Sequence, residues 1–204
     1  MFSGIIAAVG RISAIAPLST PAAAGTPTQR LKIAAGELDL SDVALGDSIA
    51  CNGVCLTVVA CEAGEFSVDV SPETFSCTVG LDAPGEINLE KALRLADRLG
   101  GHLVSGHVDG VGAVLRLEPV DEECYLLEIR APAALAKYIA PKGSIAVNGV
   151  SLTTNRVDGE LFSINLIPHT LERTTLHRLK FGSRVNLEVD LIARYVERMM
   201  TAST

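Results

Sequence analysis

The sequence predicts an all-β protein made of two tandem, homologous six-stranded Greek-key barrels with short helices and a C-terminal α-helix. Three observations predict this class. The two halves of the chain repeat the same motifs in the same order, short segments alternate apolar with polar residues, and Asn-Gly pairs stand between apolar segments. A repeat of about 97 residues has room for about six strands of ordinary length.

The repeat is clearest in one ten-residue motif. Ser48–Thr57 aligns with Ser144–Thr153 at an offset of 96, and eight of the ten residues are identical. The same offset aligns Phe66–Thr74 with Phe162–Thr170. Matches upstream of these motifs have an offset of 102, and a match downstream has an offset of 98. Because the order never changes, the halves are colinear copies of one unit.

The flanking matches define the domain organisation. Upstream, Ser3-Gly4 and Val9-Gly10 match Ser105-Gly106 and Val111-Gly112, and downstream Asn88–Glu90 matches Asn186–Glu188. The boundary between the copies falls near Gly100-Gly101. We therefore expect an N-terminal barrel over residues 1–100, a C-terminal barrel over residues 101–189 and a C-terminal helix over residues 190–204.

Local patterns predict strands and hairpins within each copy. The fall of the offset from 102 to 96 adds six residues to the first copy, and Ser19–Pro27 is expected to form an enlarged exposed hairpin loop. Phe66–Val70 and Phe162–Leu166 alternate apolar with polar residues, as half-buried strands do. The pairs Asn52-Gly53 and Asn148-Gly149 predict tight turns with positive φ.

Three segments predict helices. Leu89–Leu99 ends at two glycines, and Pro132–Ile139 begins with a proline, which suits a first helical turn. Asp190 precedes Leu191–Met200, a segment with an apolar stripe at helical spacing. This stripe consists of Ile192, Tyr195, Val196 and Met199. It can pack on its own barrel or on another subunit, and the sequence does not decide between these.

Composition narrows the class of partner. The net charge is −7, and no Lys/Arg cluster offers the basic face that a nucleic-acid binder needs. No apolar run approaches the roughly 20 residues that span a bilayer, and the N-terminus lacks the pattern of a signal peptide. We therefore expect a cytoplasmic protein with a small-molecule partner, and no binding to nucleic acid or membrane.

Cysteine and histidine spacing favours neither a metal nor a disulfide framework. The five cysteines are odd in number and contain no C-x-x-C motif, and the four histidines lack the spacing of a helical metal pair. Gly110-Val-Gly112 lacks the third glycine of the dinucleotide fingerprint, so a nicotinamide-dependent reductase is disfavoured. Taken alone, each cysteine is most simply a small buried apolar residue.

Three positions at which the copies differ carry side chains that can take part in a reaction. Cys55 in the first copy becomes Ser151 in the second, inside an otherwise almost identical hairpin. Glu73 becomes His169, and Asp190 has Ala92 opposite it. These changes are either drift between two stable barrels or a division of labour in which both copies bind and each keeps different reactive groups. A thiol with a depressed pKa can act as a nucleophile or proton donor, and a carboxylate before a helix can cap it or handle protons.

At these residues the chain closely resembles the riboflavin synthase family, of the trimeric all-β type. The resemblance covers essentially the whole chain and stands on five motifs in family order: Met1–Ile6, Asn52–Thr57, Gly101–His107, Leu166–Thr175 and Val185–Asp190. It implies a transferase that takes two molecules of 6,7-dimethyl-8-ribityllumazine and moves a four-carbon unit between them. The products are riboflavin and 5-amino-6-ribitylaminouracil, and the family uses no cofactor and no metal.

The resemblance also implies an assembly. Family members are homotrimers in which each site, holding two substrate molecules, lies between the N-terminal barrel of one subunit and the C-terminal barrel of its neighbour. This arrangement provides the proximity that a condensation of two identical molecules requires. The C-terminal helix is the expected trimerisation element, and association with lumazine synthase is left open by the sequence.

Site residues follow from the resemblance position by position. The positions implicated in catalysis are Cys55, Ser48, His107 and Asp190, with Phe2 shaping the site. The N-terminal pocket is expected to be lined by Gly4, Ile5, Ile6, Cys55, Leu56, Thr57, Asp69, Val70, Ser71, Pro72, Glu73 and Thr74. The C-terminal pocket is expected to be lined by Gly106, His107, Val108, Lys142, Ser151, Leu152, Thr153, Leu166, Ile167, Pro168, His169, Thr170 and Leu171.

One position departs from the family and two other functions compete. His169 stands where many relatives have Glu, which still allows a hydrogen bond to a ribityl hydroxyl and alters its response to pH. The main competitor is a non-catalytic lumazine- or flavin-binding protein of the same fold, of the optical antenna type. Such proteins usually lose the reactive residues or the second pocket, and both are retained here. A purely structural pair of barrels gives no reason for the paired Asn-Gly-Val-x-Leu-Thr motifs.

Overall fold

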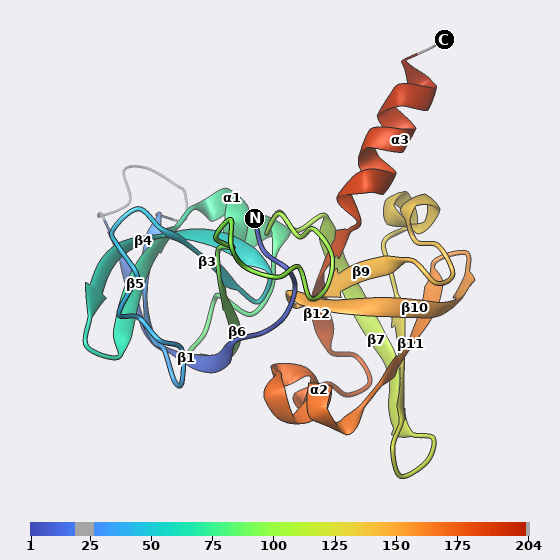
Figure 1. Ribbon diagram of the computed structural model, residues 1–204, viewed down its shortest axis with the longest axis horizontal. Coiled ribbons are helices and arrows are strands. Elements are labelled where there is room, and N and C mark those ends of the chain that lie inside the picture. The colour runs from blue at the N-terminus through green and yellow to red at the C-terminus, as the bar shows by residue number, and fades with distance from the viewer. Residues whose placement is uncertain (19–26, 203–204) are drawn as a thin grey trace.

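The computed structural model describes residues 1–18 and 27–202, and places them in two closed antiparallel barrels and a projecting helix. Figure 1 shows the barrels side by side, with the C-terminal helix extending away from both. The predicted loop Ser19–Pro27 lies, apart from its last residue, outside the described residues. Within those residues, no helix combines the length and apolarity needed to cross a membrane.

The N-terminal barrel has the strand order β1-β2-β5-β4-β3-β6. Its strands are β1 (Ala8–Pro17), β2 (Gln29–Ala34), β3 (Ser48–Cys51), β4 (Val54–Glu62), β5 (Glu65–Val70) and β6 (Gly85–Lys91), and a short helix α1 (Pro72–Cys77) follows β5. The alternation predicted for β5 is confirmed, because Phe66, Val68 and Val70 are buried in the barrel core while the residues between them are partly exposed.

The C-terminal barrel repeats this order as β7-β8-β11-β10-β9-β12. Its strands are β7 (Gly110–Pro119), β8 (Tyr125–Arg130), β9 (Ser144–Val147), β10 (Val150–Asp158), β11 (Leu161–Leu166) and β12 (Arg184–Val189). Between and after them lie the 3-10 helices η1 (Ala133–Tyr138) and η2 (Thr175–Arg178) and the α-helices α2 (Pro168–Arg173) and α3 (Leu191–Thr201). The predicted pair of homologous six-stranded barrels is therefore confirmed.

Of the three predicted helices, one is wrong and two correspond to helices in the structure. The helix predicted over Leu89–Leu99 is wrong, because Leu89 belongs to β6, pairs with Ala8 of β1 and Cys51 of β3, and is fully buried. The leucines and alanines of this segment fit a helical period, but β6 closes the barrel by pairing with both β1 and β3. The rest of the predicted helix, after β6, is irregular. The segment Pro132–Ile139 forms the 3-10 helix η1, and α3 matches its prediction. The short helices α1, α2 and η2 were not predicted.

The two Asn-Gly turns meet between the barrels. Asn52 and Asn148 have φ of 48° and 47°, and the glycines that follow have φ of 80°, as the sequence predicted. A pseudo-twofold relation extends to the hydrogen bonds around them: Asn88 Nδ2 donates to the Asn148 carbonyl and Asn186 Nδ2 donates to the Asn52 carbonyl, each at 3.0 Å. These asparagines are buried, so the interface depends on their hydrogen bonds being satisfied.

Helix α3 contacts its own barrel through polar side chains. Arg194 forms an ion pair with Asp109, and Glu197 binds Lys137 and the Tyr138 hydroxyl. The apolar stripe is on another side of the helix, where Ile192, Tyr195 and Val196 are 64%, 64% and 50% exposed. Of the two alternatives, packing on the helix's own barrel is thus not seen in the single chain, which leaves the stripe available to another subunit.

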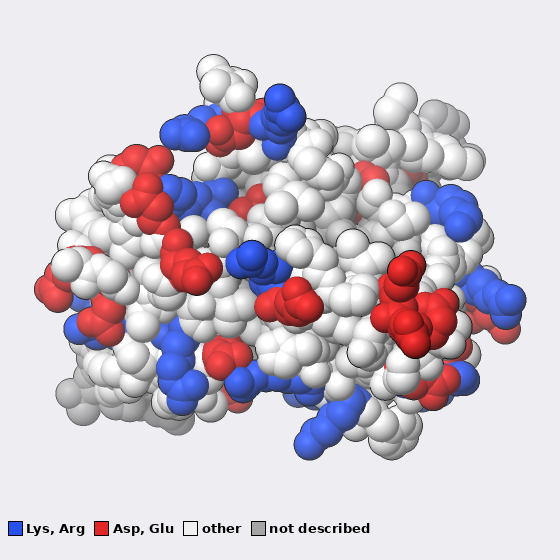
Figure 2. Space-filling model, turned by 60° about the horizontal axis from the view of Figure 1, so that its bottom comes forward, with Lys and Arg blue, Asp and Glu red and all other residues white. Residues whose placement is uncertain are grey.

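The surface mixes both signs of charge. Figure 2 shows acidic and basic side chains interspersed on the face it draws, with one gathering of acidic groups. Ion pairs such as Lys32–Glu65 and Arg178–Glu86, both at 2.7 Å, bring opposite charges together at the surface of the protein. The face drawn in Figure 2 therefore lacks a broad basic surface of the kind that follows a phosphate backbone.

Candidate active site

The chain segment that precedes each barrel crosses to the hairpin of the other barrel. The Ser151 backbone N–H donates to the Gly4 carbonyl at 2.7 Å, and the Cys55 N–H donates to the Gly106 carbonyl at 2.8 Å. Gly4 and Gly106 have φ of +76° and +81°, and a Cβ on them would lie 2.5 Å and 2.6 Å from the Cβ of Ser151 and Cys55. Only glycine allows this backbone conformation and this close approach together.

Two buried carboxylates hold the crossing segments in place. Glu90 accepts hydrogen bonds from the Ser3 N–H, the Ser3 hydroxyl and the Gly4 N–H, at 2.7, 2.6 and 2.9 Å. Glu188 accepts the matching three from Ser105 and Gly106, at 2.6, 2.6 and 2.9 Å. Burial raises the pKa of Glu90, against the lowering effect of the hydrogen bonds from Ser3 and Gly4.

This crossing corrects the predicted division of residues between the pockets. Ile6 packs against the core of the C-terminal barrel, and Val108 packs against the core of the N-terminal barrel. Gly4–Ile6 therefore belong with Ser151, and Gly106–Val108 belong with Cys55. The sequence-based grouping assigned each segment to the barrel that follows it in the chain, whereas β1 and β7 begin only after the chain has crossed.

Cys55 lies where the N-terminal barrel meets the crossing segment of the second half. Its side chain on β4 is partly buried beside Gly106. The residue after Gly106 is His107, which is exposed. Phe2 is fully buried between the barrels and its ring approaches Gly106. Phe2 thus shapes this place by packing. The nearby Cys51 has a fully buried thiol whose pKa is raised by desolvation.

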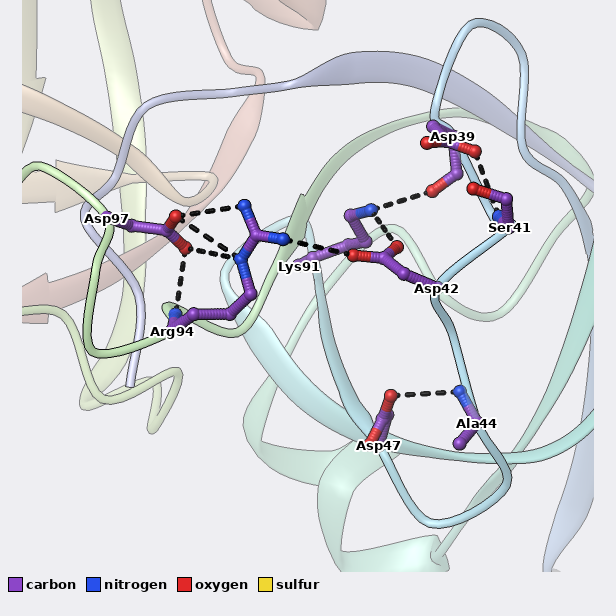
Figure 3. A network of polar contacts seen from close by, with 8 residues as sticks. All are labelled: Asp39, Ser41, Asp42, Ala44, Asp47, Lys91, Arg94 and Asp97. Carbon is purple, nitrogen blue, oxygen red and sulfur yellow. Dashed lines mark hydrogen bonds and ion pairs between the residues drawn. The ribbon is translucent and has the colours of Figure 1, made fainter.

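Ser48 lines a separate cavity of about 350 Å³ on the N-terminal barrel. The cavity lies between the β2–β3 connection and the segment after β6, and charged side chains line it (Figure 3). Lys91 Nζ binds Asp42 at 2.5 Å and the Asp39 carbonyl at 2.8 Å, and Arg94 bridges Asp42 and Asp97. In the register of the hairpin, Ser48 pairs with Thr57 and Ala50 pairs with Cys55, which places Ser48 and Cys55 on the same outward face.

Asp190 lies on the corresponding face of the C-terminal barrel. Its carboxylate accepts a hydrogen bond at 2.9 Å from the Ile192 N–H and so caps α3, one of the two roles proposed from the sequence. Among the described residues, no hydrogen bond or ion pair joins Asp190 or Ser48 to Cys55. The predicted catalytic residues therefore fall into two groups in one chain: Ser48, Cys55 and His107 with the N-terminal barrel, and Asp190 with the C-terminal barrel.

His102 is a site residue that the sequence did not single out. Its Nδ1 lies 2.7 Å from the Ser151 hydroxyl, and the residue is 8% exposed. Burial lowers the pKa of His102, partly opposed by the nearby Asp190 carboxylate. The only sequence signal was its place one residue after the boundary glycines, because its partner is 49 positions away along the chain.

The predicted binding segments divide into side-chain and backbone contributors. Leu56, Val70, Leu152, Leu166 and Leu171 are buried in the barrel cores, so only their backbone groups can face a ligand. Thr57, Ser71, Pro72, Glu73, Thr153, Ile167 and His169 are exposed, while Asp69, Thr74, Pro168 and Thr170 are partly exposed. Asp69 forms an ion pair with Arg30 at 2.7 Å, and the Ser71 hydroxyl caps α1 through the Thr74 N–H.

Lys142 is the strained member of the predicted set. It has φ of +64°, where the first copy has Gly46 with φ of +94°, and its Nζ donates to the Asn155 side chain at 3.3 Å. A side chain at such a backbone position costs conformational energy, which glycine avoids in the first copy. Within the described residues, no three His, Cys, Asp or Glu side chains gather as metal ligands would.

Comparisons with known proteins agree with this architecture. The lumazine binding domain model matches residues 3–92 and again residues 105–190. The chain is 45% identical to the riboflavin synthase of Photobacterium phosphoreum over 98% of this chain and 89% of that protein. It is 43% identical to the riboflavin synthase of Mycobacterium bovis over the whole of both.

Solved structures share the fold. The crystal structure of LumP complexed with riboflavin superposes with a TM-score of 0.80 at 27% identity, covering 93% of this chain and 99% of that one. The crystal structure of LumP complexed with 6,7-dimethyl-8-(1'-D-ribityl) lumazine superposes with a TM-score of 0.77 at 26% identity, with the same coverage. With the full-length identity to riboflavin synthases and the two domain matches, the chain belongs to the riboflavin synthase family of enzymes, built from a repeat of lumazine-binding barrels.

Proposed function

We propose that the protein catalyses the dismutation of two 6,7-dimethyl-8-ribityllumazine molecules into riboflavin and 5-amino-6-ribitylaminouracil, the last step of riboflavin biosynthesis. The observation that carries this proposal is the full-length identity of 40–45% to riboflavin synthases, together with two pseudo-equivalent faces in one chain. A reaction between two identical molecules suits a protein that offers the same binding face twice. The residues of the site supply the chemistry, with no cofactor or metal.

The reaction begins at the acidic 7-methyl group of one lumazine. Removal of a methyl proton gives a carbanion, while the other lumazine is activated by addition at its C7. We assign Cys55 and Ser48 to the N-terminal half of the site, where a thiol and a hydroxyl face outward from the same hairpin. We assign proton transfer to His107 and Asp190, because imidazole and carboxylate side chains are the usual general acids and bases of enzymes.

The binding segments supply recognition. Backbone groups of Leu56, Val70, Leu152, Leu166 and Leu171 can pair with the pyrimidinedione edge, since their side chains point into the barrels. Glu73 and His169 are exposed at equivalent positions on α1 and α2, which suits hydrogen bonds to ribityl hydroxyls. We group the remaining proposed binding positions by the two faces, with Gly106–Val108 in the N-terminal set and Gly4–Ile6 in the C-terminal set.

We propose a homotrimer in which each site forms between subunits. Cys55 and Ser48 lie on the N-terminal barrel and Asp190 lies on the C-terminal barrel, and no hydrogen bond or ion pair between described residues of one chain joins Asp190 to either. Pairing the N-terminal face of one subunit with the C-terminal face of its neighbour would bring the groups together. The exposed stripe of α3 supports such an association.

We also propose the division of the chain into residues 1–100, 101–189 and 190–204, and a cytoplasmic location. The two matched domains and the irregular segment after β6 support this division. All five cysteines are free thiols, which fits a reducing compartment.

The test is incubation of the full-length protein with 6,7-dimethyl-8-ribityllumazine alone. We expect the visible absorbance of riboflavin to rise, with one riboflavin and one 5-amino-6-ribitylaminouracil formed for every two lumazines consumed. Tight binding without turnover would overturn the enzyme proposal and favour an antenna-type binding protein. Heat-denatured protein controls for the slow uncatalysed reaction.

A further inference from the structure

Two glycines from different segments lie against the Ser151 side chain. A Cβ on Gly101 would lie 2.8 Å from the Ser151 Oγ, and a Cβ on Gly4 would lie 2.5 Å from the Ser151 Cβ. Two glycines therefore make room for this one side chain, and His102 follows the second of them.

The two ring nitrogens of His102 have different surroundings. Nδ1 and the Ser151 Oγ are 2.7 Å apart, a short hydrogen bond. The residue is more than nine-tenths buried, and among the residues that the structure describes its Nε2 has no hydrogen-bond partner. An unpaired buried polar atom costs about 1–3 kcal/mol, so its retention in this part of the molecule points to a use.

The charge state and the tautomer of the His102 imidazole decide whether Nδ1 or the Ser151 hydroxyl donates the hydrogen bond. Burial lowers the pKa of His102, so the ring is neutral at pH 7, and the Asp190 carboxylate is the charged group that acts on it. We take the tautomer with the proton on Nε2, in which the neutral ring offers Nδ1 as an acceptor to the Ser151 hydroxyl. Nδ1 then carries the lone pair and accepts the hydrogen bond from the Ser151 hydroxyl.

We propose that His102 is a positioning residue that fixes the Ser151 hydroxyl, so that the C-terminal half of the site holds an oriented oxygen at the position where the N-terminal half holds the Cys55 thiol. With its proton directed to Nδ1, the Ser151 Oγ presents its lone pairs to the bound lumazine. The second copy has thus exchanged a thiol for a hydroxyl held by an imidazole. This inference rests on the proposed function, because it concerns the same site.

The test compares Ser151→Ala, His102→Gln and His102→Asn in the full-length protein. The amide of Asn reaches the place of imidazole Nδ1, whereas that of Gln reaches the place of Nε2. We expect Ser151→Ala and His102→Gln to lower kcat by about tenfold or more with KM changed less than about twofold. His102→Asn should recover most of that loss, and the double variant Ser151→Ala/His102→Gln should be no worse than either single one.

A second measurement does not depend on turnover. Nitrogen NMR of labelled imidazoles should show His102 neutral at pH 7, with the proton on Nε2 and a hydrogen-bonded Nδ1, and this signature should change in Ser151→Ala. A protonated His102 at pH 7, equal loss in the Asn and Gln variants, or additive losses in the double variant would overturn the inference. If the wild-type protein forms no riboflavin, the proposed function fails, and the NMR signature still decides the pairing.

Discussion

Gly53 and Gly149 face each other between the two barrels, so closely that a Cβ on either would lie 2.7 Å from the backbone nitrogen of the other. Each is the second residue of an Asn-Gly turn. The turns therefore have two functions: each closes its own hairpin, and the two together bring the barrels into contact. The crossing segments at Gly4 and Gly106 depend on this contact, because they bind hairpins that it aligns.

The first prediction concerns this contact. We expect Gly53→Ala to destabilise the protein by about 1–3 kcal/mol more than Gly64→Ala, because overpacking adds to the cost of positive φ. Gly64 is the matched control, since it has nearly the same φ, +79° against +80°, and a methyl group placed on it would meet nothing within 4 Å. Chemical denaturation of both variants measures the difference, and equal losses would contradict the close contact.

The sequence predicted the barrels, the hairpins and α3, because alternation, Asn-Gly turns and an apolar stripe are local patterns. It did not predict that Leu89 lies in a strand, since closure of the barrel overrides the helical period of that segment. Nor did it place Gly4 on Ser151 or Gly106 on Cys55, because these contacts join residues far apart in the chain. The repeat thus revealed which positions are paired and the resemblance proposed them as site residues, while their grouping into two faces required the structure.

The second prediction concerns the carboxylates that hold the crossing segments. Glu188→Gln should free the Ser105–Gly106 segment, because an amide has one oxygen for three donors and places its own N–H groups against them. We expect faster alkylation of Cys55, located by peptide mass spectrometry. Glu90→Gln is the matched control, because it loosens the Gly4 segment on Ser151 instead. Equal labelling of Cys55 in both variants would contradict the crossed arrangement.

The third prediction separates the two roles of Asp190. Asp190→Asn retains an N-cap for α3 but loses the carboxylate, whereas Asp190→Ala loses both. We expect both variants to lower turnover by about 10²-fold or more if the carboxylate transfers protons. Steady-state riboflavin formation measures this, and circular dichroism follows the helix. Full activity in Asp190→Asn with loss in Asp190→Ala would leave Asp190 only as a cap.

The fourth prediction tests the thiol. Cys55→Ser should lower turnover by about tenfold or more, because a serine hydroxyl is a weaker nucleophile and a weaker acid than a thiol. Cys124→Ser is the control, a free cysteine in the connection between β7 and β8. Riboflavin formation is again the measurement. If Cys55→Ser and Asp190→Ala both stayed within about threefold of the wild-type rate, the assignment of these residues would be wrong.

The last prediction uses pH and the buried imidazole of His102. Its folded pKa lies below the ordinary value, so between these two values the unfolded chain binds a proton that the folded chain does not. The free energy of unfolding should therefore fall as pH drops below the ordinary histidine value of about 6.5, with a slope from this group of up to about 1.4 kcal/mol per pH unit. The variant His102→Asn removes this titration and leaves the other groups in place. Urea denaturation of both proteins from pH 7.5 to pH 5 isolates the difference, and parallel curves would show that His102 is not held neutral by burial.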